Sequence, residues 1–394
     1  MDEFYTNLIK SFANIMENEI IEIRRELHKI PEIALEEFKT SAFIKSKLEQ
    51  YGLYYKESFN TGVVGYINPE KTYKTILLRA DIDALPQEEQ TGLEFSSEHK
   101  GMMHACGHDF HMACLLGATK ILCALGESLD ARIILVFQPA EEDEGGALPM
   151  IEEGIADNVD ACIAMHIEPL EKTGVIQIKD DAFMACPDNF YLTVTGKGGH
   201  GAYPEKCINP ISVMSEIVTE YHKIPNSIEE KVVVSVCNIN GGFNATNIIP
   251  ETVSISGTAR MFSEKTRKEV EDKLYNITSE VCKKYNAEFD FRYNRLYPPL
   301  INSPKINKIV ENAGHALGVE VKRLEDTQMI GDDFSYFAEL APSAYFKLGV
   351  GSEELGMYPL HSPMLNPDEK ALKIGAELLA TIAVDFIQNH EKGI

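Results

Sequence analysis

The feature that most constrains the fold of this chain is a series of three short apolar segments, each as long as one buried strand. They span residues 75–78, 132–137 and 160–165. Around them, apolar residues recur at helical spacing, as over residues 17–51 and 112–122. Buried strands that alternate with helices are typical of a mostly parallel sheet covered by helices on both faces. We therefore predict an α/β fold for the larger part of the chain.

Polar side chains that can carry chemistry follow these strands. Asp81 comes shortly after the first strand, Glu141 and Glu142 follow the second, and His166 ends the third. In open α/β sheets, ligands bind at the carboxyl ends of the strands. A single acidic residue could fall there by chance. Groups on three separate strands predict a functional site at that edge of the sheet.

From about residue 181 the pattern changes. The expected order is strand, helix, strand, strand, helix, strand, which is the order of a ferredoxin-like unit. Afterwards the chain returns to long helices and one short strand. We predict a catalytic α/β domain made of residues 1–180 and 294–394, and an inserted α+β ferredoxin-like domain made of residues 181–293. The elements expected in the insertion are strands at 190–195, 232–237, 252–261 and 289–293, and helices at 210–222 and 264–285.

Composition and charge narrow the classes of function. The chain has 394 residues, of which 44% are hydrophobic and 25% charged, as expected for a globular protein of about two domains. Its formal net charge of −24 argues against nucleic acid or an anionic membrane as a partner, because both require a basic surface. No apolar run approaches the roughly 20 residues that span a bilayer.

The cysteines and the first residues favour a cytoplasmic protein. Residues 1–5 show neither the basic nor the apolar region of a signal peptide. The eight cysteines form no CxxC pair and mostly lie in apolar surroundings, which is typical of free thiols in a reducing compartment. Cys106 is the exception, because its neighbours are residue types that bind metals.

A thiol and two imidazoles occur within five residues, in the segment 104–108. Cys106 and His108 flank a glycine, so both side chains can turn toward one point. Thiolate sulfur and imidazole nitrogen are ligands that zinc and similar divalent metals prefer. A Cys-x-His pair alone is a weak signal, and its weight depends on partners elsewhere in the chain.

Two adjacent glutamates and two histidines are further candidates. Glu141 and Glu142 can supply the two carboxylate roles of a hydrolytic metal site, one that binds metal and one that takes a proton from water. A solvated acidic loop is the alternative for this pair. His166 is either a ligand or a core histidine bonded to the backbone. His361, in a loop between prolines, is either a ligand or a surface histidine.

The chain resembles members of peptidase family M20, in the subgroup of aminoacylases, hippurate hydrolases and auxin–amino acid conjugate hydrolases. The matching segments occur in the same order and span nearly the whole chain. They are residues 25–32, 79–86, 104–109, 138–142, 198–202, 257–260 and 333–336, together with His166 and His361.

The resemblance implies a site for two divalent metal ions, with zinc as the most expected metal and manganese, cobalt or nickel as alternatives. Glu141 would act as general base and acid, taking the proton of the attacking water and returning it to the departing amine. Asp81 would orient one of the ligands. The implied protein ligands are Cys106, His108, Glu142, His166 and His361.

The same resemblance implies that the inserted domain is a lid through which the chain forms a homodimer. His200, which lies between glycines, would hydrogen-bond the oxyanion of the substrate bound by the other chain. A histidine without a role at a hairpin tip is the alternative. Asn247 would face the substrate. Arg260 ends an expected strand and is suited to a free carboxylate, although it could instead pair with a local acid.

We therefore predict a metal-dependent amidohydrolase that cleaves the linear amide bond of N-acyl-L-amino acids, releasing a carboxylate and a free amino acid. A dipeptidase or carboxypeptidase with the same two-metal site is the nearest alternative. A hydrolase with Cys106 as its nucleophile is a further one. A non-catalytic binding protein would be expected to have lost Glu141 or a ligand, and none is missing.

Overall fold

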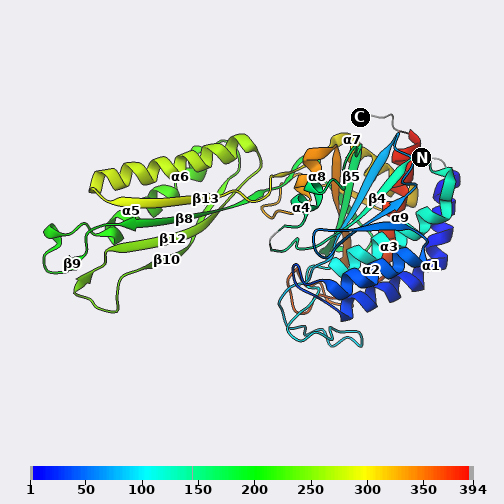
Figure 1. Cartoon of the computed structure of the whole chain (residues 1–394), viewed down its shortest axis with the longest axis horizontal. Coiled ribbons are helices and arrows are strands. Elements are labelled where there is room, and N and C mark those ends of the chain that lie inside the picture. Colours follow the sequence, from blue (N-terminus) through cyan, green and yellow to red (C-terminus); the bar gives the residue numbers. More distant parts are fainter. Residues whose placement is uncertain (1–2, 144, 390–394) are drawn as a thin grey trace. The chain divides into compact units, whose positions relative to one another are not determined.

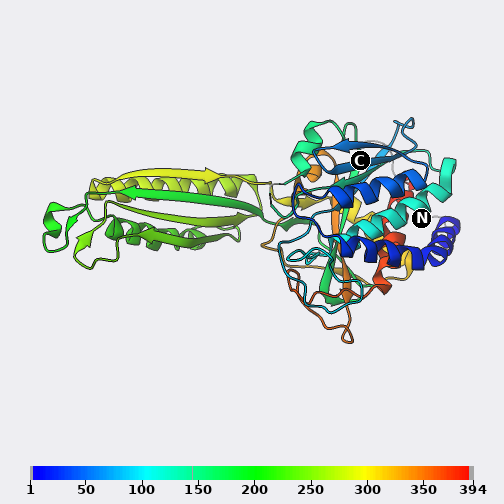
Figure 2. The ribbon, with the colours of Figure 1, turned by 60° about the horizontal axis from the view of Figure 1, so that its bottom comes forward.

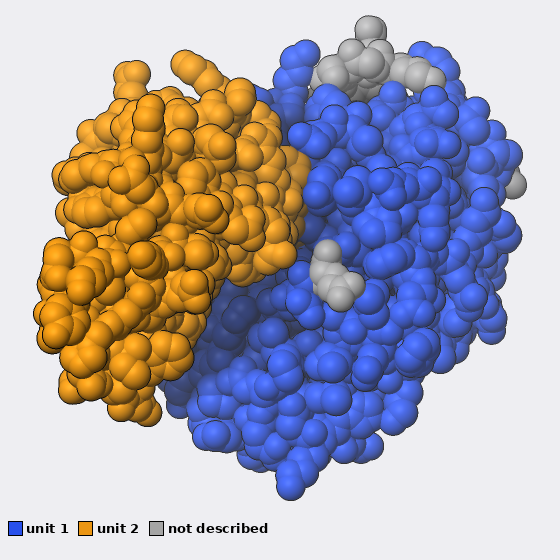
Figure 3. Space-filling view, turned by 60° about the vertical axis from the view of Figure 1, so that its left-hand side comes forward, with its two compact units in different colours: residues 1–181, 301–325, 333–394 blue, residues 182–300, 326–332 orange. Residues whose placement is uncertain are grey.

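The computed structural model describes residues 3–143 and 145–389 of the chain (Figures 1 and 2). The contacts between its residues divide it into two compact units, which Figure 3 colours separately. Each unit has its own hydrophobic core. The first unit contains residues 1–181, 301–325 and 333–394, and the second contains residues 182–300 and 326–332.

The first unit is built on an eight-stranded sheet, whose strands are β1 (Tyr54–Ser58), β2 (Gly62–Ile67), β3 (Thr75–Asp81), β4 (Arg132–Gln138), β5 (Ala161–Lys172), β6 (Ile176–Ile178), β15 (Val321–Arg323) and β16 (Ser343–Gly351). The order across the sheet is β1-β2-β4-β3-β5-β16-β6-β15. The central strands β4, β3, β5 and β16 run parallel, as do β6 and β15, and the remaining neighbours are antiparallel. This confirms the predicted α/β fold with a mixed, mostly parallel sheet.

The helices of the first unit are α1 (Glu3–Lys29), α2 (Phe38–Gln50), α3 (His108–Leu125), α4 (Ala147–Glu152), α7 (Pro304–Leu317), α8 (Ser335–Leu340) and α9 (Lys370–Asn389), with a 3-10 turn η1 (Gly126–Ser128). α1, α3 and α9 pack against one another, and α7 packs against α9. Nearly all of α3 is buried, because apolar residues occupy every side of this helix. Among the helices of the described chain, none is both long and apolar enough to cross a membrane.

The second unit contains an antiparallel sheet and two helices that cover one of its faces (Figure 1). In chain order its main elements are β8 (Cys186–Thr195), α5 (Pro210–Tyr221), β10 (Val233–Gly241), β12 (Thr252–Met261), α6 (Glu264–Tyr285) and β13 (Glu288–Asn294). The strand order is β10-β12-β8-β13. Buried residues alternate with more exposed ones along β12, as expected for a sheet with helices on one face only.

Shorter elements complete the second unit and the crossings between units. β9 (Gly199–His200) and β11 (Ile248–Ile249) form a small antiparallel sheet, and 3-10 turns lie at η2 (Pro204–Lys206) and η3 (Ile224–Ser227). The chain leaves the first unit at β7 (Asp181–Met184) and first returns at β14 (Leu300–Asn302).

The prediction that the third apolar strand ends at His166 was wrong. β5 continues to Lys172, so His166 lies in the middle of the strand. Its pairing with β16 also continues past this point, with Lys347 opposite His166 and Leu348 opposite Ile167. Backbone pairing with residues 181 positions later in the chain keeps this polar residue within β5, and the local sequence does not reveal the partner strand.

The helical spacing predicted over residues 17–51 belongs to two helices, α1 and α2, which are separated by residues 30–37. Pro31 has no N–H group and clashes with the preceding turn, so a helix cannot continue through it. The segment between the helices carries Glu32 and Glu37, whose side chains are both buried.

Candidate active site

The candidate residues of the first unit lie after or within its central strands and at the start of α3. They are, in chain order, Asp81 at the end of β3, Cys106 and His108 at the start of α3, Glu141 and Glu142 in the loop after β4, His166 within β5, and His361 in the loop after β16.

The turn between Cys106 and His108 requires glycine. Gly107 has a φ of +85°, which residues with a side chain rarely adopt. A Cβ atom at this position would lie 2.2 Å from Cδ1 of Ile167 in β5. Gly107 therefore lets the chain turn sharply against β5 immediately before α3, and it brings the two flanking side chains to one side.

The ligand-type atoms of these side chains converge. Sγ of Cys106 lies 3.5 Å from Nε2 of His166. Oε1 of Glu142 lies 3.8 Å from Nε2 of His108 and 3.3 Å from Nε2 of His361. Within each of three groups, ligand atoms lie no more than 4.8 Å apart, and these groups are Cys106–His108–His166, Cys106–Glu142–His361 and His108–Glu141–Glu142.

Hydrogen bonds on the far ring nitrogens turn two histidines toward this cluster. Nδ1 of His166 donates to the carbonyl oxygen of Ile167 at 2.7 Å. Nδ1 of His108 donates to Oδ1 of Asp83 at 3.2 Å. In both rings Nε2 is therefore the nitrogen that faces the cluster. This is the usual arrangement of histidines that bind metals.

The donor set fits divalent metal ions. Nε2 of His108 and Oε1 of Glu142 are buried and have no hydrogen-bond partner in the described part of the chain. Such atoms are costly to bury unless a cation satisfies them. The combination of thiol, imidazole and carboxylate is suited to zinc and to neighbouring first-row metals.

The environment of Cys106 differs from that of an activated cysteine. Burial, together with the nearby Glu142 and Glu141 carboxylates, raises the pKa of its thiol well above the usual value. Nucleophilic cysteines instead have a lowered pKa, through a basic neighbour or a helix N-terminus. In these surroundings a thiolate requires a bound cation, which favours the role of metal ligand.

The pKa values of two histidines in the cluster reflect their burial and the charges around them. Burial lowers the pKa of His166 well below its usual value, so its ring is neutral and able to bind metal. Burial also opposes protonation of His108, but the Asp81 and Asp83 carboxylates outweigh it and raise its pKa to about 10. The surplus of carboxylates thus attracts positive charge into the cluster.

His111 also belongs to this site, and its role was not predicted from the sequence. Its Nδ1 donates to Oδ1 of Asp81 at 2.6 Å, and its Nε2 accepts the backbone N–H of Ile167 at 2.9 Å. Both nitrogens are occupied, so His111 is a positioning residue. The signal for it was its place three residues after His108, since such residues share one side of a helix.

The profile of Peptidase family M20/M25/M40 matches residues 77–385. The chain belongs to this family. Thermostable carboxypeptidase 1 of Saccharolobus solfataricus is 38% identical over 388 residues, which cover 96% of this chain and 98% of that protein. N-acetyl-L-cysteine deacetylase of Bacillus subtilis is 36% identical over 381 residues, which cover 96% of this chain and 90% of that protein.

A solved structure of the same family has a closely similar fold. The YXEP protein of Bacillus subtilis, described as a dinuclear metal binding peptidase from the M20 family, matches with a TM-score of 0.86 and 29% identity. The match covers 96% of this chain and all of that one. These relationships confirm the predicted family and the predicted class of enzyme, a metal-dependent amidohydrolase.

The other candidate residues of the M20 chain lie in its second unit. His200 in β9 is exposed and pairs with Ile248, and the carbonyl oxygen of the adjacent Asn247 accepts the N–H of Gly201 at 2.7 Å. Arg260 lies near the far end of β12, and Thr252 begins that strand. The part of β12 from Thr252 to Arg260 spans roughly 27 Å at 3.4 Å per residue. Ile248, the pairing partner of His200, lies just before the Thr252 end of this strand. His200 and Arg260 of one chain are therefore well separated.

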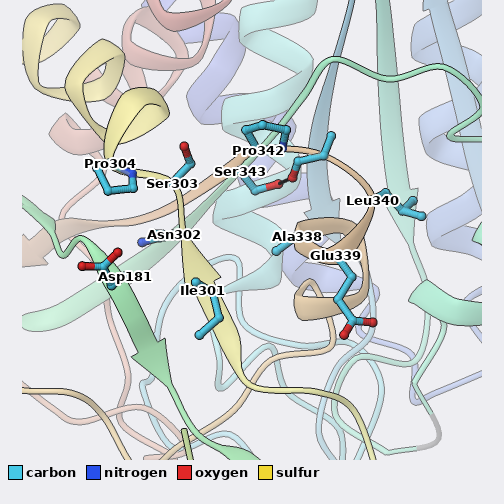
Figure 4. A pocket seen from close by; sticks show the side chains of 11 residues that line it. Asp181, Ile301, Asn302, Ser303, Pro304, Ala338, Glu339, Leu340, Pro342 and Ser343 are labelled. Atoms are coloured by element: carbon cyan, nitrogen blue, oxygen red, sulfur yellow. Dashed lines mark hydrogen bonds between the residues drawn. The ribbon is translucent and has the colours of Figure 1, made fainter. Parts of the chain in front are cut away.

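A pocket of about 440 Å³ elsewhere in the first unit is separate from this cluster (Figure 4). It lies between the start of α7, the end of α8 and the start of β16, and its lining includes Ile301, Glu339 and Ser343. None of the candidate metal ligands lines it. The pocket therefore does not contribute to the candidate active site.

Proposed function

We propose that this M20 enzyme hydrolyses the amide bond of N-acyl-L-amino acids and releases a carboxylate and a free amino acid. The observation that carries the proposal is the convergence of Cys106, His108, Glu142, His166 and His361 beside Glu141. The similarity to N-acetyl-L-cysteine deacetylase supports an N-acyl amino acid as substrate. A peptide with a free carboxyl terminus is the second candidate substrate, because the chain is also similar to a carboxypeptidase.

In this proposal the five converging residues hold two divalent ions, with zinc favoured because the set includes a thiol and three imidazoles. Manganese, cobalt and nickel are the alternatives. When bound, such ions lower the pKa of water and polarise the scissile carbonyl group. Asp81 holds His111 and thereby positions the segment of β5 that carries His166.

Glu141 acts as general base and then as general acid. Its carboxylate takes a proton from water as the water oxygen forms a bond to the carbonyl carbon. When the bond between carbon and nitrogen breaks, Glu141 gives that proton to the departing amine. This role is supported by the adjacent Glu142. In the proposal Glu142 binds metal, so the carboxylate of Glu141 is available for proton transfer.

The second unit is proposed to supply substrate contacts and a dimer interface, as an inserted lid made of about residues 181–293. Arg260 binds the free carboxylate of the amino acid through paired hydrogen bonds. Asn247 faces the substrate, and His200 contacts the substrate bound by the other chain. This division is supported by the separation of His200 and Arg260, since a small substrate cannot touch both side chains of one chain.

The reducing cytoplasm is the proposed location of the enzyme. All eight cysteines are free, and the thiol of Cys106 must remain reduced to bind metal. Oxidation of this thiol would remove one ligand of the cluster.

One panel of assays tests the function. N-acetyl and N-benzoyl amino acids, their amino acid amides and dipeptides are incubated with the enzyme in zinc, manganese, cobalt or nickel. We expect hydrolysis of N-acyl amino acids, weaker hydrolysis of the amides that lack a free carboxylate, and loss of activity with a chelator. Faster turnover of dipeptides would instead favour the peptidase. Activity that survives chelation but not alkylation would establish a cysteine nucleophile.

A further inference from the structure

The loop that carries Glu141 begins with a backbone conformation that needs support. Ala140 has a φ of +56°, in the left-handed region that residues with a side chain rarely adopt. The residue is fully buried, and its carbonyl oxygen accepts the N–H of Gly145 at 2.8 Å. A strained residue of this kind persists only where surrounding contacts hold it in place.

Two buried carboxylates hold the backbone on either side of Glu141. Oε1 of Glu37 accepts the N–H of Ala140 at 3.0 Å, and Oδ2 of Asp83 accepts the N–H of Glu142 at 3.0 Å. Asp83 also accepts a hydrogen bond from His108 and so supports the metal cluster. Glu37 belongs to none of the metal-binding groups found among the described residues, and the proposed mechanism has not used it.

Glu37 is itself held in place by distant parts of the first unit. It is the N-cap residue of α2, but its side chain does not cap the helix. Its carbonyl oxygen accepts the N–H of Ser41 at 2.8 Å, and the hydroxyl of Thr61 donates to Oε2 at 2.5 Å. The side chain is fully buried. Its carboxyl group therefore gives the N–H of Ala140 a fixed partner.

From these contacts we infer that Glu37 is a positioning residue for the general base, an inference that rests on the proposed role of Glu141. Without the acceptor at Glu37, the turn at Ala140 relaxes toward an ordinary backbone conformation. The carboxylate of Glu141 then moves relative to the bound substrate, while Asp83 still holds Glu142. Proton transfer is impaired, and the metal ligands stay in place.

Two substitutions at this position separate the hydrogen bond from the charge. Glu37→Gln keeps an oxygen that accepts from Ala140, and its amide group can donate to the hydroxyl of Thr61. Glu37→Ala removes both contacts. Glu32→Ala is the matched control, because the Glu32 side chain accepts hydrogen bonds from Lys39 and Thr40 in the same region and makes none to the loop of Glu141.

The experiment compares the parent holoenzyme with these three variants. Measurements are kcat, KM, metal content and amide hydrogen exchange of the peptide covering residues 139–147. For Glu37→Ala we expect a fall in kcat of roughly 10²-fold, the usual cost of a small misplacement of a catalytic group. KM and two metals per chain should be retained, and exchange in the peptide should be faster. Glu37→Gln should restore both kcat and exchange, and Glu32→Ala should leave the exchange as in the parent.

Parental kcat and exchange in Glu37→Ala would overturn the inference, as would the same losses in Glu32→Ala. A parent enzyme that hydrolyses nothing in the substrate panel would refute the proposed function, and the exchange measurements would still decide the role of Glu37. If Glu37→Ala does not fold, Thr61→Val provides the test. It removes the hydroxyl that holds the Glu37 carboxyl group, so it should accelerate exchange in residues 139–147, and unchanged exchange would overturn the inference.

Discussion

His111 and Asp81 form a buried pair in which Nδ1 of the imidazole donates to Oδ1 of the carboxylate at 2.6 Å. Nε2 of the same ring accepts the backbone N–H of Ile167, the residue after His166. The end of β3 is thus joined to the middle of β5 through one side chain of α3. This connection fixes the backbone beside the candidate ligand His166, and His111 itself does not act as a ligand.

We expect His111→Ala to weaken metal binding without removing a ligand. Loss of a residue that orients ligands typically costs 10- to 100-fold in metal affinity, by order of magnitude. Competition with a chromophoric chelator measures the affinity, and elemental analysis at saturating metal should still find two ions. Cys114→Ala, a buried change on the same helix whose thiol hydrogen-bonds the carbonyl oxygen of Leu372 in α9, controls for general destabilisation of α3. An unchanged affinity would contradict the role given to His111.

The adjacent glutamates should separate catalysis from metal binding. Glu141→Gln keeps the volume of the side chain but cannot accept a proton, so we expect a loss in rate of roughly 10²–10⁴-fold with two metals retained. Glu142→Gln should lose metal, because a neutral amide replaces the carboxylate between His108 and His361. Rates and metal content of both proteins decide the assignment. Metal loss in Glu141→Gln would exchange the two roles.

Cys106→Ser should weaken metal binding, because an alcohol stays protonated near neutral pH and is a poor ligand for soft metals. Burial raises the pKa of the parental thiol, so metal has to displace a proton from it. The affinity of the parent should therefore fall as the pH is lowered, and it should fall less steeply in the serine variant. Metal titrations between pH 6 and 8 test both points. Equal affinities would place Cys106 outside the metal site.

His200 should act on the substrate bound by the partner subunit. His200→Ala is expected to lose roughly 10²–10³-fold in rate, the usual cost of one oxyanion donor, with its metals retained. Inactive His200→Ala and Glu141→Gln chains are then dissociated, mixed and reassociated. In a mixed dimer, one site would carry both defects and the other neither, so about half of the parental activity per dimer should return. If confirmed mixed dimers stay inactive, His200 acts within its own chain.

Glu377 in α9 should make the stability of the protein depend on pH, independently of the active site. Burial raises the pKa of Glu377 from 4.5 to about 7, despite the opposing effect of Lys373 and Lys10. The folded protein therefore keeps this proton longer than the unfolded chain, and stability decreases as the pH rises from about 4.5 to 7. Glu377→Gln should raise the free energy of unfolding by about 1–3 kcal/mol at pH 8 and by much less at pH 5. Denaturant titrations at both pH values test this, with Glu22→Gln, a change at an exposed residue of α1, as the control. An equal gain at both pH values would contradict it.

The sequence predicted most of the strands that carry the site, because buried parallel strands leave continuous apolar runs. The strand at residues 252–261 and the helix at 264–285 have the predicted bounds. The place of His166 within β5 was missed, since it depends on pairing with β16. Such pairing joins segments far apart in the chain and has no local signature.

The supporting residues of the site were harder to predict than the candidate ligands. Asp83 and Glu37 lie in loops and resemble ordinary acidic surface residues, yet both are fully buried. Their contacts to the loop of Glu141 are with backbone N–H groups, those of Glu142 and Ala140. Any residue type except proline can offer such a donor, so no pattern of side chains indicates the contact.

The second unit is assembled from two separate stretches of the chain, because the short segment 326–332 belongs to it together with residues 182–300. Ala185 donates its N–H to the carbonyl oxygens of Gln328 and Ile330, at 3.0 and 2.9 Å, and Gln328 donates to Phe183 at 2.8 Å. A truncated enzyme made by replacing residues 182–300 with a linker would leave this strip without its hydrogen-bonding partners. Conversely, residues 182–300 expressed alone would lack it. A minimal first unit therefore needs two linkers, one in place of residues 182–300 and one in place of residues 326–332, and a minimal second unit needs one linker between its two pieces. A graft of the second unit onto another scaffold has to carry both pieces.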